Sequence, residues 1–167
     1  MSESKLLGLD TLDTGIPAVT RRHERSMDLA EEAFIAKRRG ELDTAKRLFI
    51  EALTLESSAA ESFPPDKQSE PTRSILYRSA ASLAYHAELY ERAEGLITAG
   101  LAGHPPAEIR AELVALQDKI DLYRTINTLE TLVNKQAVTT WDEMLLQRVK
   151  NVVHTIETRV QGQVLLK

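Results

Sequence analysis

The sequence predicts an all-α protein, and three observations lead to that class. Apolar residues recur three or four positions apart over long stretches, the spacing of one helix face, and few windows alternate with period two. The seven glycines and six prolines of the 167-residue chain gather at a few points where they would end helices. One pattern of two helices joined by a tight turn occurs twice between residues 29 and 105. An internal repeat of this kind sets the architecture of a chain.

Composition and charge narrow the classes of function. The chain is 43% hydrophobic and 28% charged, which suits one domain, or one domain with a tail. Its net charge of −4 and pI of about 5.6 provide no general basic field, so nucleic-acid binding is not expected. The absence of cysteine excludes disulfides, thiolate zinc sites and a cysteine nucleophile. No apolar run approaches the roughly 20 residues of a membrane span, and no signal peptide is recognisable, so we expect a cytoplasmic protein.

The repeat is defined by its turns and by the small residues around them. The turn at residues 40–42 aligns with the turn at residues 88–90. Gly40 supplies the left-handed residue that often ends a helix. Small residues near the turn allow neighbouring helices to approach closely. The aligned pairs are Ala33 with Ala81, Ala36 with Ala84, Ala45 with Ala93, Phe49 with Ile97, Ala52 with Gly100, and Leu53 with Leu101.

The chain has three predicted parts. Residues 1–17 mix small, acidic and apolar types without helical period, and we expect a flexible N-terminal segment, although its piece at residues 6–9 could instead dock on the body. Residues 18–105 hold two helical hairpins, which are joined by a polar, proline-bounded loop at residues 62–71. Residues 106–167 are expected to form two long C-terminal helices that cap the repeats.

Two apolar stripes predict these C-terminal helices. The first stripe covers residues 109–133, which corresponds to roughly 37 Å of helix at 1.5 Å per residue. Thr140 and Glu143 match a capping box at the start of the second helix, whose stripe covers residues 145–160. The two helices either pack on the repeats or form a seam between two copies of the chain, with Asn127 setting the register.

The doubled pattern resembles the tetratricopeptide repeat (TPR), a 34-residue helical hairpin with small residues where its helices cross. Ala33 and Ala81 fit the family's eighth position, and Ala45 and Ala93 fit its twentieth. The resemblance covers roughly residues 26–105 and implies a right-handed superhelix of two hairpins, closed by a long capping helix and a C-terminal helix. Two features depart from the family: the copies are 48 residues apart, and a stable array usually has three or more copies.

The resemblance also implies where a partner would bind, because the first helix of each TPR hairpin lines a concave groove. Cations mixed with aromatic rings suit an acidic peptide or a partner helix. The alternative is that these are ordinary solvated side chains, with Phe34 and Tyr85 partly buried. The implied groove residues are Glu31, Phe34, Lys37 and Arg38 from the first copy, and Ile75, Arg78, Ser82, Tyr85 and His86 from the second.

No pattern in the sequence predicts catalysis, a metal or a cofactor. The four histidines, at positions 23, 86, 104 and 154, lack the spacing of metal ligands on one helix face. Neither a Gly-rich phosphate loop nor a nucleophile elbow is present. We therefore expect a non-catalytic scaffold, an adaptor or regulatory subunit, whose partner is another protein or peptide. The alternative is a structural protein that dimerises through its C-terminal helices.

Overall fold

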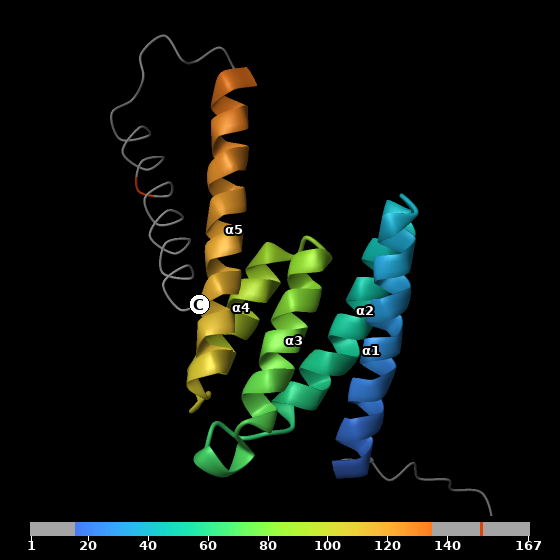
Figure 1. Cartoon of the computed structure of the whole chain (residues 1–167), viewed down its shortest axis with the longest axis vertical. Coiled ribbons are helices and arrows are strands. Elements are labelled where there is room, and N and C mark those ends of the chain that lie inside the picture. The colour runs from blue at the N-terminus through green and yellow to red at the C-terminus, as the bar shows by residue number, and fades with distance from the viewer. Residues whose placement is uncertain (1–15, 135–150, 152–167) are drawn as a thin grey trace, which may run out of the picture. The chain divides into compact units, whose positions relative to one another are not determined.

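The computed structural model describes residues 16–134 and 151, and this part of the chain is all-α, as predicted, with no strand. The predicted capping box at Thr140 and the last helix lie outside the described residues. So does the N-terminal segment, except for its last two residues, which begin the first helix. The elements are α1 (Ile16–Arg38), α2 (Leu42–Glu61), the 3-10 turn η1 (Lys67–Ser69), α3 (Thr72–His86), α4 (Tyr90–Leu101) and α5 (Ala107–Asn134) (Figure 1).

The chain divides into two compact units, residues 1–117 and residues 118–167, and their boundary falls within α5. In the first unit each of the first four helices packs on its neighbour in sequence: α1 on α2, α2 on α3, and α3 on α4 (Figure 1). Short turns join α1 to α2 and α3 to α4, whereas the longer loop at residues 62–71 joins α2 to α3.

The two short turns have the same backbone geometry. In the first, Gly40 has a φ of 79°, and the following amide donates to the carbonyl of Ala36 at 3.0 Å. In the second, Glu88 has a φ of 62°, and the following amide donates to the carbonyl of Ala84 at 2.9 Å. A left-handed residue followed by this hydrogen bond is the Schellman ending of a helix. Both turns therefore close in one way, at equivalent positions of the repeat.

The aligned positions of the repeat form much of the core of the first unit. The bulky pair, Phe49 and Ile97, keeps only 1% and 2% of its surface exposed. Apart from Leu53 and Leu101, the other aligned positions have small side chains that let the helices pack at short separation, which explains why alanine recurs there. The buried alanines at aligned positions are Ala33, Ala36, Ala45, Ala52, Ala81, Ala84 and Ala93.

Gly100 marks the place where the second hairpin meets the start of α5. A Cβ atom on Gly100 would lie 3.1 Å from Cβ of Tyr77 and 3.1 Å from Cδ1 of Leu113. The first copy has Ala52 at the aligned position, and that side chain is fully buried. Glycine in the second copy leaves space for the close approach of Tyr77 and Leu113.

Burial along the stripe predicted on α5 decreases after Ile120. Leu113, Leu116 and Ile120 are buried, whereas Tyr123 and Ile126 are 37% and 44% exposed. Every helix within residues 16–134 is too short or too polar to cross a membrane.

Candidate protein-binding face

Five aromatic side chains from all four helices of the two hairpins form a connected row. The centroid of the Phe34 ring lies 5.0 Å from the centroid of the Phe49 ring and 4.9 Å from that of the His86 ring, and both pairs meet edge to face. His86 stacks on Phe49 at 5.4 Å and contacts Tyr85 at 5.5 Å. Tyr85 in turn contacts Tyr90 at 5.8 Å. We call these five residues the ring row; pairs of this kind contribute about 0.5–1.5 kcal/mol each beyond their buried area.

The ring row joins an exposed ring to a buried one. Phe49 is 1% exposed, whereas Phe34 is 38% exposed. Phe34, Tyr85 and His86 belong to the groove implied by the sequence, and the structure brings these three together. Phe49 and Tyr90 complete the row; by sequence, Phe49 is the bulky aligned position of the first copy and Tyr90 belongs to the second turn. The signal that could have linked them is that each is an aromatic residue at an aligned position of the repeat.

The other groove residues divide between the two helices. Lys37 and Arg38 follow Phe34 by three and four positions, so they share its face of α1, and both are exposed. Glu31 is also exposed and precedes Phe34 by three positions on that face. The α3 residues at positions 75 and 82 are half-buried. The exposed part of the face thus lies on α1.

Arg78 has a partner within the chain. Its Nη1 atom lies 3.0 Å from Oε2 of Glu112 on α5. Both side chains are partly exposed, so the pair is screened and contributes little to stability, about 0–1 kcal/mol. The contact nevertheless uses the charge of Arg78, which the sequence had placed in the groove as a free cation.

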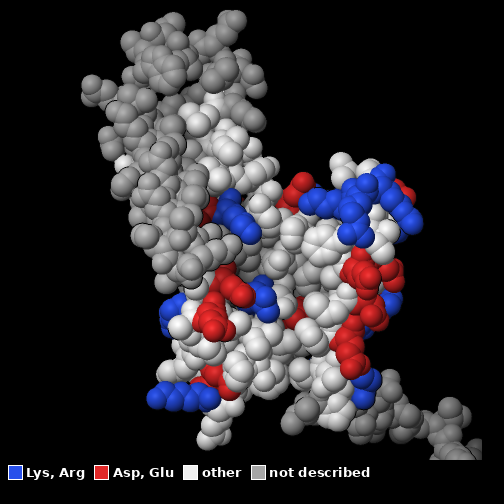
Figure 2. Space-filling view, in the orientation of Figure 1, with Lys and Arg blue, Asp and Glu red and all other residues white. Residues whose placement is uncertain are grey.

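Basic side chains gather at the end of the first hairpin. Residues 37–47 carry five basic and two acidic side chains, and Figure 2 shows the blue atoms together where α1 ends. Nζ of Lys46 lies 3.0 Å from Oε2 of Glu88, whereas the other four cations make no ion pair within the described part of the chain. We call the five the basic corner: Lys37, Arg38, Arg39, Lys46 and Arg47, all of them exposed.

A fully buried carboxylate lies where α1, α2 and α3 meet. Glu56 of α2 has no exposed surface, and both of its oxygens lie 3.0 Å from Nδ1 of His23 on α1. The hydroxyl groups of Ser26 on α1 and Ser79 on α3 lie near it, and Oγ of Ser26 donates to the carbonyl of Ala52 at 2.9 Å. Burial raises the pKa of Glu56 above its ordinary value, although His23 and the two hydroxyls act in the opposite direction. The His23 side chain is 38% exposed, so the pair reaches solvent on one side.

The sequence did not predict this carboxylate. Apolar periodicity does not mark position 56, because the apolar Leu55 is half-buried whereas the neighbouring Glu56 is buried. Glu56 follows Ala52 by four positions and so lies on the same buried side of α2. Its partner on α1 is 33 residues away, and no local pattern reports such a distance.

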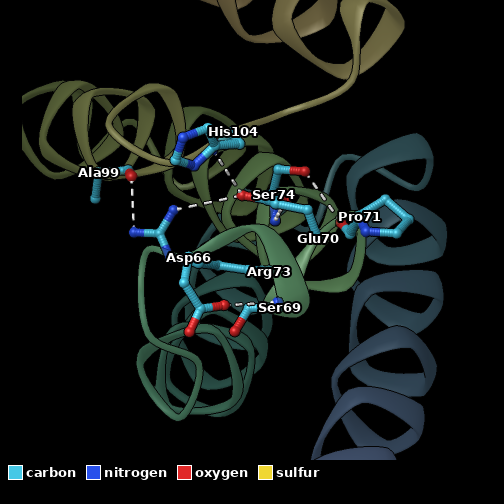
Figure 3. A network of polar contacts seen from close by, with 8 residues as sticks. All are labelled: Asp66, Ser69, Glu70, Pro71, Arg73, Ser74, Ala99 and His104. Carbon is cyan, nitrogen blue, oxygen red and sulfur yellow. Dashed lines mark hydrogen bonds and ion pairs between the residues drawn. The ribbon is translucent and has the colours of Figure 1, made fainter.

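A second polar cluster ties down the loop at residues 62–71 (Figure 3). One oxygen of Glu70 accepts from the amide of Ser74 at 3.1 Å, and the other accepts from the amide of His104 at 3.2 Å. Oδ1 of Asp66 accepts from the amide of Ser69 at 2.9 Å. Glu70 therefore satisfies an amide at the start of α3 and holds the connection between α4 and α5 beside it.

Arg73 completes this cluster, which we call the latch: Asp66, Ser69, Glu70, Arg73, Ser74 and His104. Nη2 of Arg73 donates to the carbonyl of Ala99 at 2.9 Å, and Nη1 lies 3.9 Å from Oε1 of Glu70. The guanidinium also sits 4.5 Å above the ring of Tyr77. A Cβ atom on Gly103 would lie 2.6 Å from Nη1, so protein atoms fill this space. The arrangement joins α3, α4 and the loop, and we assign it a structural role.

Within residues 16–134 and 151, no group of three or more His, Cys, Asp or Glu side chains could hold a metal ion. Comparison with protein-family models, with curated proteins and with solved structures finds no match to this chain.

Proposed function

We propose that this chain is a non-catalytic binding protein, an adaptor or regulatory subunit, that recognises another protein or peptide through the ring row and the adjoining face of α1. The observation that carries the proposal is Phe34, which is 38% exposed although it contacts two other rings. An exposed aromatic ring on a rigid support is typical of the anchor residues of protein interfaces.

The proposal includes a TPR-like arrangement of the two hairpins. It is supported by the equal geometry of the turns at Gly40 and Glu88 and by the burial of the aligned small residues. In such an arrangement the residues implied by the family line one groove. Because fold analogy is a weak basis for function, the groove must be tested by its own side chains.

Binding at this face would use a preorganised surface. Phe49 and His86 hold the ring of Phe34 from two other helices, so little side-chain freedom remains to be lost on binding. A flexible partner would lose most of the conformational entropy. Arg78 already holds Glu112, so we assign it to positioning the start of α5 rather than to contact with the partner.

A photocrosslinking amino acid tests this function directly. It is placed at Phe34 in the full chain and, as a matched control, at Ile50 on α2, which is 40% exposed. We expect the variant at position 34 to crosslink to a distinct protein in a lysate of the native cells and the variant at position 50 not to do so. Equal products at the two positions, or none at position 34, would contradict the proposal.

The alternative, self-association through the C-terminal helices at residues 106–167, stays a prediction. Light scattering over a concentration series tests it, and a monomer at all concentrations would exclude this alternative.

A further inference from the structure

We infer that the basic corner is the docking site for an acidic segment of a partner protein, with an apolar side chain of that segment packed on Phe34. This inference rests on the proposed function and deepens it, because it names the chemistry of the partner and the end of the face where it binds.

The charge distribution is the first argument. The whole chain has a net charge of −4, yet residues 37–47 carry five basic against two acidic side chains, a local charge of +3. Two of these cations, Lys37 and Arg38, lie in the last turn of α1, where they also complement the helix dipole. Arg47 lies on α2, so the dipole of α1 does not account for it. An excess of unpaired cations on an acidic protein provides local complementarity to a negative partner.

The position of the exposed ring is the second argument. Phe34 lies one helical turn before Lys37 and Arg38, so the ring and the two charges share one face of α1. The guanidinium of Arg38 can form paired hydrogen bonds to a carboxylate, which a lysine cannot. The face therefore fits a segment in which a bulky apolar residue is followed or preceded by acidic residues.

The rest of the face is unfavourable to acids, which fixes the site at the basic corner. Glu31 is an exposed acid on the same face as Phe34, and Arg78 is neutralised by Glu112 at 3.0 Å. A carboxylate bound midway along the face would meet one like charge and one cation already paired. At the basic corner it meets unpaired cations.

Nucleic acid fits this surface less well than an acidic protein segment. A nucleic-acid site combines a positive track for several phosphates with rings on which bases stack. Here the cations occupy one end of one hairpin, and Phe34 meets both neighbouring rings edge to face. The overall acidity of the chain also repels a polyanion beyond the basic corner.

A phage-displayed library of random dodecapeptides, selected on the full wild-type chain, tests the inference without a known partner. We expect the enriched peptides to be more acidic than the input library and to contain a large apolar residue. Fluorescein-labelled copies of the enriched peptides are then titrated by fluorescence polarisation. We expect Lys37→Glu with Arg38→Glu to weaken binding at least tenfold, and added salt to weaken binding to the wild-type chain.

The matched control is Arg110→Glu with Lys119→Glu. These two exposed cations lie on α5, and the control changes the net charge by the same amount as the test variant. We expect this variant to bind like the wild-type chain. Equal loss in the two variants would mean that only the overall charge matters, and it would overturn the inference.

Three other outcomes separate the inference from the function on which it rests. In the first, the enriched peptides carry no excess of acidic residues and yet bind the Phe34→Ala variant more weakly than the wild-type chain. That result would leave the proposed function standing and overturn the inference. No enrichment on the full chain would overturn both. Tighter binding of a labelled 20-nucleotide single strand than of any enriched peptide, lost in the double variant at positions 37 and 38, would assign the basic corner to nucleic acid instead.

Discussion

Glu88 occupies, in the turn between α3 and α4, the left-handed position that Gly40 occupies between α1 and α2. Their φ angles are 62° and 79°, and both turns are closed by the same hydrogen bonds. Glycine adopts this conformation without steric cost, whereas a residue with a Cβ atom is destabilised there by roughly 1–2 kcal/mol. The second copy of the repeat thus keeps the turn although it lacks the residue that suits it.

Replacement of Glu88 by glycine is expected to stabilise the protein by about 0.5–1 kcal/mol. The relief of backbone strain exceeds the loss of the exposed pair with Lys46, which contributes about 0–1 kcal/mol. Glu88→Ala is the matched control, because it removes the same ion pair and keeps the strain. The free energy of unfolding, measured in urea, should be higher for the Glu88→Gly variant than for the Glu88→Ala variant. Equal values for the two variants would show that the position carries no strain.

The buried carboxylate of Glu56 should make stability depend on pH. Its pKa in the folded state lies above the ordinary value of 4.5, which we take for the unfolded state. At pH values between the unfolded-state pKa and the folded-state pKa, the folded state therefore binds more protons than the unfolded state. The free energy of unfolding of the wild type therefore falls as pH rises through this window. Glu56→Gln removes that fall. The free energy of unfolding of the variant minus that of the wild type should therefore be larger at pH 8 than at pH 4.5, by more than about 0.5 kcal/mol.

Urea unfolding at several pH values from 4.5 to 8 measures this effect, with Glu51→Gln as the control. Glu51 is exposed on the same helix, so its replacement should stay within about 0.5 kcal/mol of the wild type throughout. A constant difference between Glu56→Gln and the wild type over this range would contradict the prediction.

His23→Ala should have the opposite effect to Glu56→Gln. It leaves the buried carboxylate without its hydrogen-bond partner, which destabilises the protein by about 1–3 kcal/mol near neutral pH. In the Glu56→Gln background the same change should cost much less, because no buried charge remains, and a double-mutant cycle measures the difference. His104→Ala is a control at an exposed ring. Additive effects of the changes at positions 23 and 56 would show that the two groups do not interact.

The helices and the register of the repeat were predictable because both depend on local patterns. Helical periodicity and the residues of the turns fixed the start of α2 at Leu42 and the left-handed residue at Gly40. The alignment of the two copies placed Glu88 opposite Gly40, and the structure has a left-handed residue at both positions. Such features need only neighbours a few residues away, which a sequence displays directly.

The candidate site was predictable only in part. Phe34 and His86 could be assigned to one groove through the resemblance to the TPR hairpin, and their rings do meet. The pairing of Arg78 with Glu112 could not be foreseen, since it depends on where α5 packs against α3. The burial of Glu56 could not be foreseen for the same reason, because it arises only when three helices come together. Long-range pairs of charged residues leave no periodic signal in a sequence.

The latch provides the last prediction, through two glycines that differ in their surroundings. A Cβ atom on Gly103 would lie 2.6 Å from both Nη1 of Arg73 and Oε1 of Glu70, and those side chains are buried and held by hydrogen bonds. Gly103→Ala should therefore destabilise the protein by about 1–3 kcal/mol. Gly95, inside α4, has no atom within 4 Å of such a position, so Gly95→Ala should stabilise the helix by up to about 1 kcal/mol.

Thermal and urea unfolding of the two alanine variants would measure these opposite shifts under one set of conditions. Both variants add one methyl group and reduce the freedom of the unfolded chain by a similar amount, so the difference between them combines the gain in helix propensity at Gly95 with the clash at the latch. In Arg73→Met, which frees the space beside Gly103, the penalty of Gly103→Ala should shrink. An undiminished penalty in that background would mean that the methyl group disturbs the backbone of the connection rather than the latch.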